Sequence, residues 1–250
     1  MPKWRAPHLL ISEGDVSRYV ILTGDPGRIP WFSSMLENSR VLARNREFIV
    51  ANGYYKNIMV TLCSTGIGAP STAIALEELY RCGSRVFVRV GSCGALDPEL
   101  DVGDVVVPYA AVRLDGAGRR IAPIEYPAVA NPTLHNMLVE NAGRLGLRVK
   151  SGVIVSDDLF YGEPGEYEYW AKLGAVAVEM ESSIILLYTS VRRCCGASIL
   201  VVDGNILAGT GKAEKGAEKG VEHDEIVRRG LEKAFKAVLE SICEMHGQGL

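Results

Sequence analysis

Apolar residues occur along the chain in two patterns, as short continuous runs and as longer periodic runs. A short continuous run is typical of a strand that is buried on both faces of a sheet. An apolar residue at every third or fourth position is instead typical of an amphipathic helix. The continuous runs predict strands at Tyr19–Thr23, Ile58–Cys63, Val86–Val90, Val105–Val107, Arg148–Val155, Ala175–Val178 and Ser198–Val202.

The periodic runs predict the helices and the gaps between runs predict the loops. The helices are expected at Thr72–Cys82, Thr133–Leu145, Glu166–Leu173, Glu181–Arg193 and Asp224–Met245. The Gly- and Pro-rich stretch after Val107 predicts a loop up to about Pro132, and the charged repeat at 213–220 predicts an exposed loop. Strands that alternate with helices indicate the α/β class. We therefore expect a three-layer fold, with a central mixed, largely parallel β-sheet flanked by helices, in a single domain over residues 1–250.

Composition excludes several classes of protein. Of the 250 residues, 48% are hydrophobic and 23% are charged, which is typical of a globular chain and not of a disordered one. The net charge of −3 argues against nucleic acid as a bulk partner. No apolar stretch reaches the ~18 residues that a membrane span needs, and the start lacks the apolar core of a signal peptide. We therefore expect a soluble, cytoplasmic protein without a membrane partner.

The six cysteines do not indicate a metal centre. None forms a CxxC pair or has a histidine at metal-ligand spacing, so no metal site is expected. Thiols packed as small apolar residues are the favoured interpretation, and a disulfide stays open.

Five segments carry polar residues at or near the predicted strand ends, where ligands bind in open α/β sheets. They are GDPGR at 24–28, GIGAPS at 66–71, RVGSCG at 89–94, EMES at 179–182 and DGN at 203–205. The second resembles a dinucleotide fingerprint, but the acidic residue expected at the end of the next strand is missing. This argues against a nicotinamide cofactor, and tight packing of strand against helix is the alternative.

Three arginines are candidates for holding an anion. The glycines around Arg28 let backbone amides approach an anion, although Asp-Pro-Gly is also ordinary turn chemistry. Arg89 lies inside an apolar strand, where an arginine needs either a bound anion or a structural ion pair. The following Gly91-Ser92 offers amides and a hydroxyl at the same place. Arg46 is the third candidate cation, with a surface charge as its alternative.

The acidic residues suggest a sugar site and a proton donor. Glu179 and Glu181 are two apart, so in an extended segment they face the same side. Carboxylates accept well from vicinal hydroxyls, although favourable charge at a helix N-terminus would also explain them. Asp203 follows an apolar run, a common place for either a catalytic carboxylate or a turn cap.

Taken in this order, GDPGR, TGIGAPS, RVGSCGAL, SDDLFY and VEMES resemble the trimeric-hexameric nucleoside phosphorylase family. That family includes purine nucleoside, methylthioadenosine and uridine phosphorylases, and the resemblance runs from His8 to about Asn205. It implies reversible phosphorolysis of a nucleoside to a free base and a pentose 1-phosphate, with inorganic phosphate as co-substrate and no cofactor. It also implies a homo-oligomer, expected to be a hexamer built from dimers.

The resemblance implies a role for each matching residue. Gly24, Arg28, Arg46, Arg89 and Ser92 would hold the phosphate. Met180 and Glu181, with Glu179 nearby, would bind the ribose, together with His8 of a neighbouring subunit. Phe160 and Gly94 would contact the base.

The purine branch is the closer match, with one displaced residue. Uridine phosphorylases place a glutamine and an arginine in the region of Phe160–Trp170, and neither occurs here. The purine branch ends a strand with Val-Ser-Asp, whereas this chain reads Val202-Asp203-Gly204. Consecutive side chains of a strand point to opposite faces, so Asp203 serves as the general acid only if the backbone bulges, which Gly204 would ease.

Three other activities stay open at this point. They are uridine phosphorolysis, a nucleosidase that uses water instead of phosphate, and a non-catalytic nucleoside-binding protein. The resemblance implies that related hydrolases lack the full arginine set, so Arg28, Arg46 and Arg89 favour phosphorolysis over hydrolysis.

Overall fold

A computed structural model describes residues 4–162, 164–211 and 221–249, so the predicted loop at 213–220 lies outside the described residues. The strands are β1 (Tyr19–Thr23), β2 (Glu37–Asn45), β3 (Phe48–Tyr55), β4 (Ile58–Ser64), β5 (Val86–Ala95), β6 (Val105–Leu114), β7 (Ala128–Val129), β8 (Val149–Asp157), β9 (Ala175–Glu179) and β10 (Cys195–Asn205). The helices are α1 (Arg28–Ser33), α2 (Ala69–Arg81), α3 (Gly116–Ile121), α4 (Pro132–Arg144), α5 (Pro164–Lys172), α6 (Ser182–Val191) and α8 (Val221–Gly247).

The pairing of the strands forms a mixed sheet that partly closes on itself. Parallel pairings join β4, β1, β5 and β10 in that order, and also β6, β8 and β9. Antiparallel pairings of β5 with β9 and of β6 with β10 complete a circuit of five strands, β5–β9–β8–β6–β10. The antiparallel β2 and β3 extend the sheet beyond β4. The predicted α/β class and the mixed sheet are confirmed.

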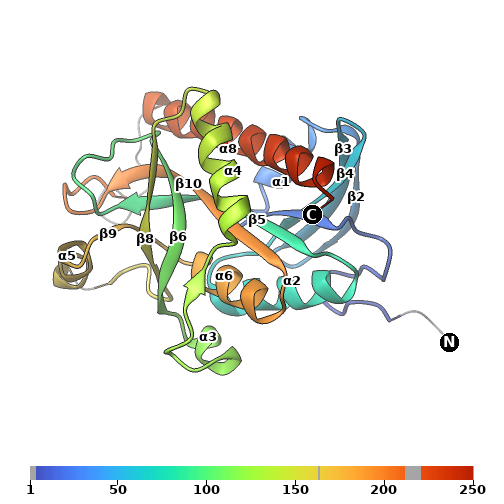
Figure 1. Ribbon diagram of the computed structural model, residues 1–250, viewed down its shortest axis with the longest axis horizontal. Helices are drawn as coiled ribbons and strands as arrows, with labels where there is room; N and C mark the ends of the chain where they lie inside the picture. Colours follow the sequence, from blue (N-terminus) through green and yellow to red (C-terminus); the bar gives the residue numbers. More distant parts are fainter. Residues whose placement is uncertain (1–3, 163, 212–220, 250) are drawn as a thin grey trace.

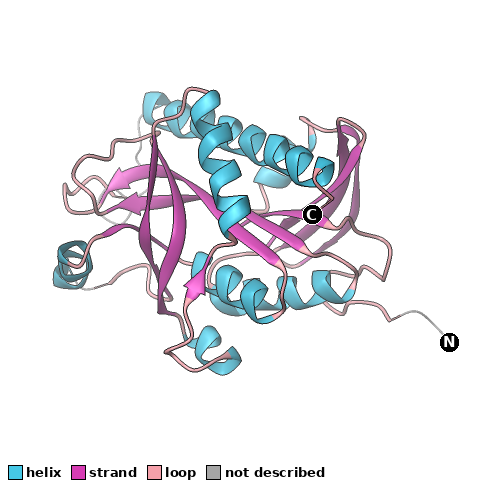
Figure 2. Ribbon diagram, in the orientation of Figure 1, coloured by secondary structure: helices cyan, strands magenta, loops and turns pink. Residues whose placement is uncertain are grey.

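Helices cover both faces of the sheet. Helices α4 and α8 pack against each other and against β10 on one face, while α2 and α6 pack together on the other (Figure 1). Figure 2 shows the strands as a layer between these two groups of helices. The first face buries Phe32 of α1 against Phe235 of α8, with ring centroids 4.3 Å apart. These buried clusters hold the strand ends in fixed positions.

Strands β2, β3 and β7 were not predicted from the sequence pattern. Most residues of β2 are exposed, so this strand shows no continuous apolar run. Strand β3 is almost entirely buried, but Asn52 and Gly53 interrupt its apolar run. Strand β2 forms because it pairs with β3, from which two residues separate it. The stability of such a strand depends on its partner as well as on its own residues.

The predicted loop between Val107 and about Pro132 is wrong over much of its length. Strand β6 continues to Leu114 because it pairs with β8 along its whole length. Helix α3 follows, with the Asp115 carboxylate accepting from the Gly118 amide as its N-cap. The buried Arg113 organises the rest of the segment by donating to backbone carbonyls, which are those of Gly118, Ala122, Pro123, Ile124 and Tyr126.

Two negative findings apply to the described part of the chain. No helix there is both long and apolar enough to cross a membrane. No disulfide joins any of the six cysteines, all of which lie in the described ranges.

Candidate active site

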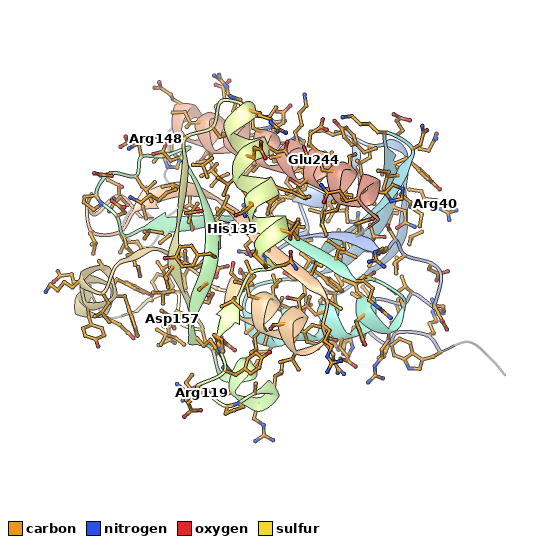
Figure 3. The ribbon with its side chains drawn as sticks, in the orientation of Figure 1. Arg40, Arg119, His135, Arg148, Asp157 and Glu244 are labelled. Carbon is orange, nitrogen blue, oxygen red and sulfur yellow. The ribbon has the colours of Figure 1, made fainter. Side chains whose placement is uncertain are left out.

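A cavity of about 730 Å³ lies where six strands end or pass. Gly24 follows β1, Gly66 follows β4, and Phe160 follows β8. Figure 3 labels Asp157 at the carboxyl end of β8 and Arg148 next to its opposite end. Strands β5, β9 and β10 contribute from within. The lining includes Gly24, Arg28, Arg89, Ser92, Gly94, Phe160, Glu179, Met180, Glu181 and Asp203. These are ten of the twelve residues predicted from the sequence.

Arg89 lies between two carboxylates. Its Nε donates to Glu179 Oε2 at 2.9 Å, and its Nη2 lies 2.5 Å from Glu181 Oε2. Burial alone would lower the pKa of Arg89, but the charges of Glu181 and Glu179 raise it above its ordinary value. Arg89 is therefore held as a cation, and the structural ion pair considered for it is present within a site that can also take an anion.

The glycine after Arg89 makes room for this arrangement. A Cβ at Gly91 would lie 2.7 Å from Arg89 Cζ, so any larger residue would displace the guanidinium. Gly24 is close on the other side, since a Cβ there would lie 3.8 Å from Arg89 Nη1 and 3.3 Å from the Gly66 carbonyl oxygen. The absence of side chains at Gly91 and Gly24 thus leaves room for the Arg89 guanidinium.

The two glutamates have different surroundings. Glu179 accepts hydrogen bonds from the Arg89 guanidinium, the Ser156 hydroxyl and the backbone amides of Glu181 and Ser182. Both of its carboxylate oxygens are engaged by these donors. The side chain therefore has little capacity left for a sugar, although it lines the cavity.

Glu181 accepts fewer hydrogen bonds than Glu179, so it can accept more from a ligand. Its Oε1 accepts from the Gly68 amide at 2.7 Å, at the start of α2, and its Oε2 meets Arg89. Burial raises the pKa of Glu181, against the lowering effect of the Arg89 charge. A hydroxyl donor that approached this carboxylate would offset part of the cost of burying it.

Arg28 differs from Arg89 because no ion pair or hydrogen bond engages its guanidinium among the described residues. It lines the cavity from the start of α1. Burial lowers its pKa, and the neighbouring charge of Arg89 lowers it further. The charges of Asp25, Asp203 and Glu181 oppose this lowering, and a bound anion would oppose it further.

The far end of the cavity is mostly apolar. Phe160 is 45% exposed and its ring meets Tyr161 edge-on at 4.9 Å between centroids. A Cβ at Gly94 would lie 2.7 Å from Ile206 Cδ1, so Gly94 leaves a flat surface beside that side chain. The remaining apolar lining at this end comes from Cys93, Leu159, Tyr167, Val178 and Ile206. A planar ring fits such a space.

Asp203 reaches the cavity through a β-bulge. The pairing of β10 with β5 runs from Val202 opposite Cys93 to Asn205 opposite Ala95, so β10 contains one residue more than β5 over this interval. The bulge re-aims a side chain. Asp203 accordingly lines the cavity while only 5% exposed. The bulge on which its role was predicted to depend is present.

Gly204 is required at its position for a steric reason. A Cβ there would collide with the carbonyl oxygen of Thr210 and would lie 2.9 Å from the Gly211 Cα. An aspartate at this position, where the purine branch carries it, would therefore clash with the backbone. The steric requirement for glycine at 204 is therefore compatible with an acidic residue at 203 and not at 204.

His8 and Arg46 do not line the cavity that the described residues of this chain form. Arg46 is exposed in the turn between β2 and β3, with a positive φ of 54°. His8 is near this turn, because the Asn45 side-chain amide donates to the His8 carbonyl at 2.8 Å. The buried Glu78 accepts from the His8 amide and from its Nδ1 at 2.7 Å. The two residues therefore lie together, outside their own chain's cavity.

Several lining residues were not singled out from the sequence. Glu47, Ile67, Ser71, Tyr167 and Ile206 also line the cavity. A local signal existed for Ile67 and Ser71, which belong to the GIGAPS segment. The other three reach the cavity through the paths of loops and of α5, which periodicity does not reveal.

No group of three or more His, Cys, Asp or Glu side chains within the described ranges is placed to hold a metal ion. The polar groups of the cavity instead suit an anion at one end and hydroxyls beside it.

Comparison with known proteins gives a consistent set of matches. The model of the phosphorylase superfamily matches residues 18–242. A guanosine phosphorylase of Halorubrum lacusprofundi is 38% identical over 242 residues, which cover 96% of this chain and 99% of that protein. A uridine phosphorylase of Thermococcus kodakarensis is 45% identical over 166 residues, covering 65% of this chain and 60% of that protein.

A solved structure is similar over almost the whole length. It is that of purine nucleoside phosphorylase from Toxoplasma gondii in complex with immucillin-H, with a TM-score of 0.89 and 34% identity. The match covers 99% of each chain.

Proposed function

The chain belongs to the phosphorylase superfamily and is a nucleoside phosphorylase, a pentosyltransferase, and we propose that it acts by preference on purine nucleosides. The reaction is the reversible phosphorolysis of a nucleoside to a free base and a pentose 1-phosphate. The observation that carries the purine assignment is the bulge of β10, at which the Asp203 side chain lines the cavity. A purine leaves more readily when its ring accepts a proton, and Asp203 can supply one.

The composition of the apolar end supports a purine over uracil. Among the described lining residues, Arg28 and Arg89 are the only arginines and no glutamine occurs. Recognition of uracil by a glutamine and an arginine therefore has no counterpart in this part of the site. The similarity to a guanosine phosphorylase over 96% of the chain agrees with the purine assignment.

The phosphate would bind at the arginine end. Among the described residues no ion pair at hydrogen-bonding distance engages the Arg28 guanidinium, and Arg89 lines the same cavity. Arginines bind phosphate through paired hydrogen bonds, and Ser92 adds a hydroxyl beside them. Attack by a phosphate oxygen on C1′ forms the new C–O bond as the C–N bond to the base breaks.

The ribose would bind at Glu181, beside Met180. The Glu181 carboxylate can accept from the 2′ and 3′ hydroxyls, because among the described residues it contacts only the Gly68 amide and Arg89 at hydrogen-bonding distance. Glu179 has a different role in this proposal. Its oxygens accept from Arg89 and from the amides after it, so it orients Arg89 and the start of α6.

The site would be completed by a second copy of the chain. His8 and Arg46 lie together but outside their own cavity, and the Phe160 ring is 45% exposed at the cavity edge. In a homo-oligomer, for which we propose a hexamer built from dimers, His8 would reach the ribose and Arg46 the phosphate of the neighbouring subunit. The same contact would cover Phe160.

A panel of nucleosides tests the proposed function. Inosine, guanosine, adenosine, methylthioadenosine and uridine are each incubated with the enzyme, with and without phosphate, and the free base and pentose 1-phosphate are measured. We expect phosphate-dependent cleavage that is fastest with a purine. Fast cleavage of uridine alone would replace the purine assignment by that of a uridine phosphorylase, as in the Thermococcus kodakarensis relative. Base release at full rate without phosphate would identify a nucleosidase.

A further inference from the structure

The bulge at Asp203 interrupts the regular register of β10 against β5. The register passes from Val202 opposite Cys93 to Asn205 opposite Ala95, so Asp203 and Gly204 lie in the irregular interval. Asp203 is buried, with 5% exposure. A buried backbone carbonyl oxygen needs a hydrogen-bond donor.

His223 supplies that donor. Its Nε2 lies 3.0 Å from the carbonyl oxygen of Asp203, although the two residues are 20 positions apart. A carbonyl oxygen only accepts, so the contact requires the hydrogen of the ring to be on Nε2. Nδ1 is buried without a hydrogen-bond partner in the described part of the chain, and it lies 3.6 Å from Asp224 Oδ1. Within the described residues, the imidazole of His223 thus forms its hydrogen bond through Nε2.

The histidine stands on a rigid support. It lies in the first turn of α8, a helix of 27 residues that packs on β10 and β5. Leu231 and Phe235 anchor the helix in the buried core, with 4% and 0% exposure. The helix can therefore hold the imidazole in place against the peptide that follows Asp203.

The other side of the bulge is fixed by the turn that follows it. The Thr210 amide donates to the Asn205 carbonyl at 2.9 Å, and the Asn205 amide donates to Thr210 Oγ1 at 2.9 Å. This turn brings the Thr210 carbonyl oxygen against Gly204. The peptide between Asp203 and Gly204 lies between the turn and His223, so its orientation depends on both.

We propose that His223 is a positioning residue for the general acid, which holds the Asp203 peptide so that the carboxyl group points at the purine ring. The inference rests on the proposed function of Asp203 as proton donor. Without the hydrogen bond the peptide can rotate, and the carboxyl group moves away from the ring. A displacement of about 1 Å at a catalytic group costs up to ~100-fold in rate.

A pair of variants matched in size separates the hydrogen bond from the packing. His223→Gln keeps an amide N–H that can reach the Asp203 carbonyl, whereas His223→Met has similar length and no donor. Both are assayed as full-length enzyme on guanosine and on 7-methylguanosine. The second substrate carries a positive charge on its ring before cleavage, so its base leaves without an incoming proton.

We expect His223→Met to lower kcat on guanosine by ~10- to 100-fold and to leave kcat on 7-methylguanosine within ~3-fold of wild type. The phosphate KM should not change, and His223→Gln should retain most of the activity on guanosine. Equal losses of His223→Met on both substrates, no loss on either, or a Gln variant as impaired as the Met variant would overturn the inference. A general structural defect would affect the two substrates alike.

The Asp203→Asn variant, assayed in parallel, keeps the two proposals distinguishable. Asp203→Asn could lose activity on guanosine and not on 7-methylguanosine, while His223→Met affects the two substrates equally. That result would contradict the role of His223 and leave the general acid of the proposed function in place. If Asp203→Asn itself does not discriminate, the general acid of the proposed function fails.

Discussion

Arg28 and Arg89 line the same cavity, but their surroundings differ. We therefore expect the two arginines to contribute differently to phosphate binding and to the stability of the fold. Arg89 is the counter-ion of two buried carboxylates, and Arg28 has no charged partner at ion-pair distance among the described residues. The same substitution should therefore have different consequences at the two positions.

Arg28→Ala should weaken phosphate binding with little loss of stability. Removal of one charge-assisted contact to a buried anion costs about 2–4 kcal/mol, which appears as a raised phosphate KM. The thermal midpoint should stay close to that of the wild type, because burial already lowers the pKa of this guanidinium and no ion pair is lost. Steady-state kinetics with phosphate as the varied substrate measure the effect, and an unchanged phosphate KM would contradict the assigned role.

Arg89→Ala should impair phosphate binding and also destabilise the protein. It leaves Glu179 and Glu181 buried without their counter-ion, which typically costs about 3–5 kcal/mol. The loss of stability should depend on pH. The pKa of Glu181 is already raised by burial, and loss of Arg89 removes the main influence that lowers it.

The sign of that dependence follows from proton binding. A carboxyl group whose pKa is higher in the folded state binds more protons when folded, so stability rises as the pH falls toward the unfolded-state pKa. The thermal midpoint of Arg89→Ala should therefore recover toward that of the wild type when the pH is lowered from neutral toward about 5. A deficit that is constant over this range would show that the buried carboxylates do not cause it.

Glu181→Gln should distinguish ribose from deoxyribose. The carboxylate is expected to accept from the 2′ and 3′ hydroxyls, and an amide offers one acceptor oxygen instead of two. Cleavage of ribonucleosides should fall far more than cleavage of 2′-deoxynucleosides, measured as kcat/KM for inosine and 2′-deoxyinosine. Equal losses on the two substrates would contradict hydroxyl recognition by Glu181.

At the scale of elements, the end of β10 determines where the acid lies. The extra residue between Val202 and Asn205 shifts the register against β5, and Gly204 fits only because it has no side chain. The position of the carboxylate thus depends on the bulge and the Thr210 turn acting together.

Moving the acid by one position tests this dependence. The double variant Asp203→Ser with Gly204→Asp recreates the Val-Ser-Asp order of the purine branch, but its Cβ at 204 would collide with the Thr210 backbone. We expect no recovery of kcat on inosine relative to Asp203→Asn, which itself should be lower than wild type by at least ~100-fold. The thermal midpoint of the double variant should also fall. Wild-type activity in the double variant would mean that the turn adapts and that the bulge is not required.

At the scale of the whole molecule, the chain does not bring all twelve predicted site residues together. His8 and Arg46 lie near each other at the Asn45 turn and outside the cavity of their own chain. The proposed hexamer would supply them to the neighbouring site, so activity should depend on assembly.

Mixed oligomers test the shared site. His8→Ala and Asp203→Asn should each be impaired, yet a mixed oligomer contains some sites with Asp203 from one chain and His8 from the other. Random mixing in a dimer restores about one site in four, because the symmetric pair has two equivalent sites. Co-expression followed by activity measurement should show this recovery. Activity that stays at the average of the two separate variants would contradict a shared site.

The sequence by itself determined the α/β class, most strands and helices, and ten of the cavity-lining residues. Continuous apolar runs predict buried strands, and the chemistry of the family motifs lies at the strand ends. These features are local, so they can be read from neighbouring residues along the chain. The phosphorylase assignment followed from them and agrees with the family match.

Only the tertiary structure decided the features that depend on contacts between helices and strands. Strand β2 exists because β3 pairs with it, and β6 continues through the predicted loop because β8 pairs along its length. The structural ion pair of Arg89 depends on Glu179 at the end of β9 and on Glu181 at the start of α6, and the sequence pattern did not give their positions relative to Arg89. The register of β10 against β5 decided that Asp203 enters the cavity, because a side chain's face depends on pairing and not on its own residue type.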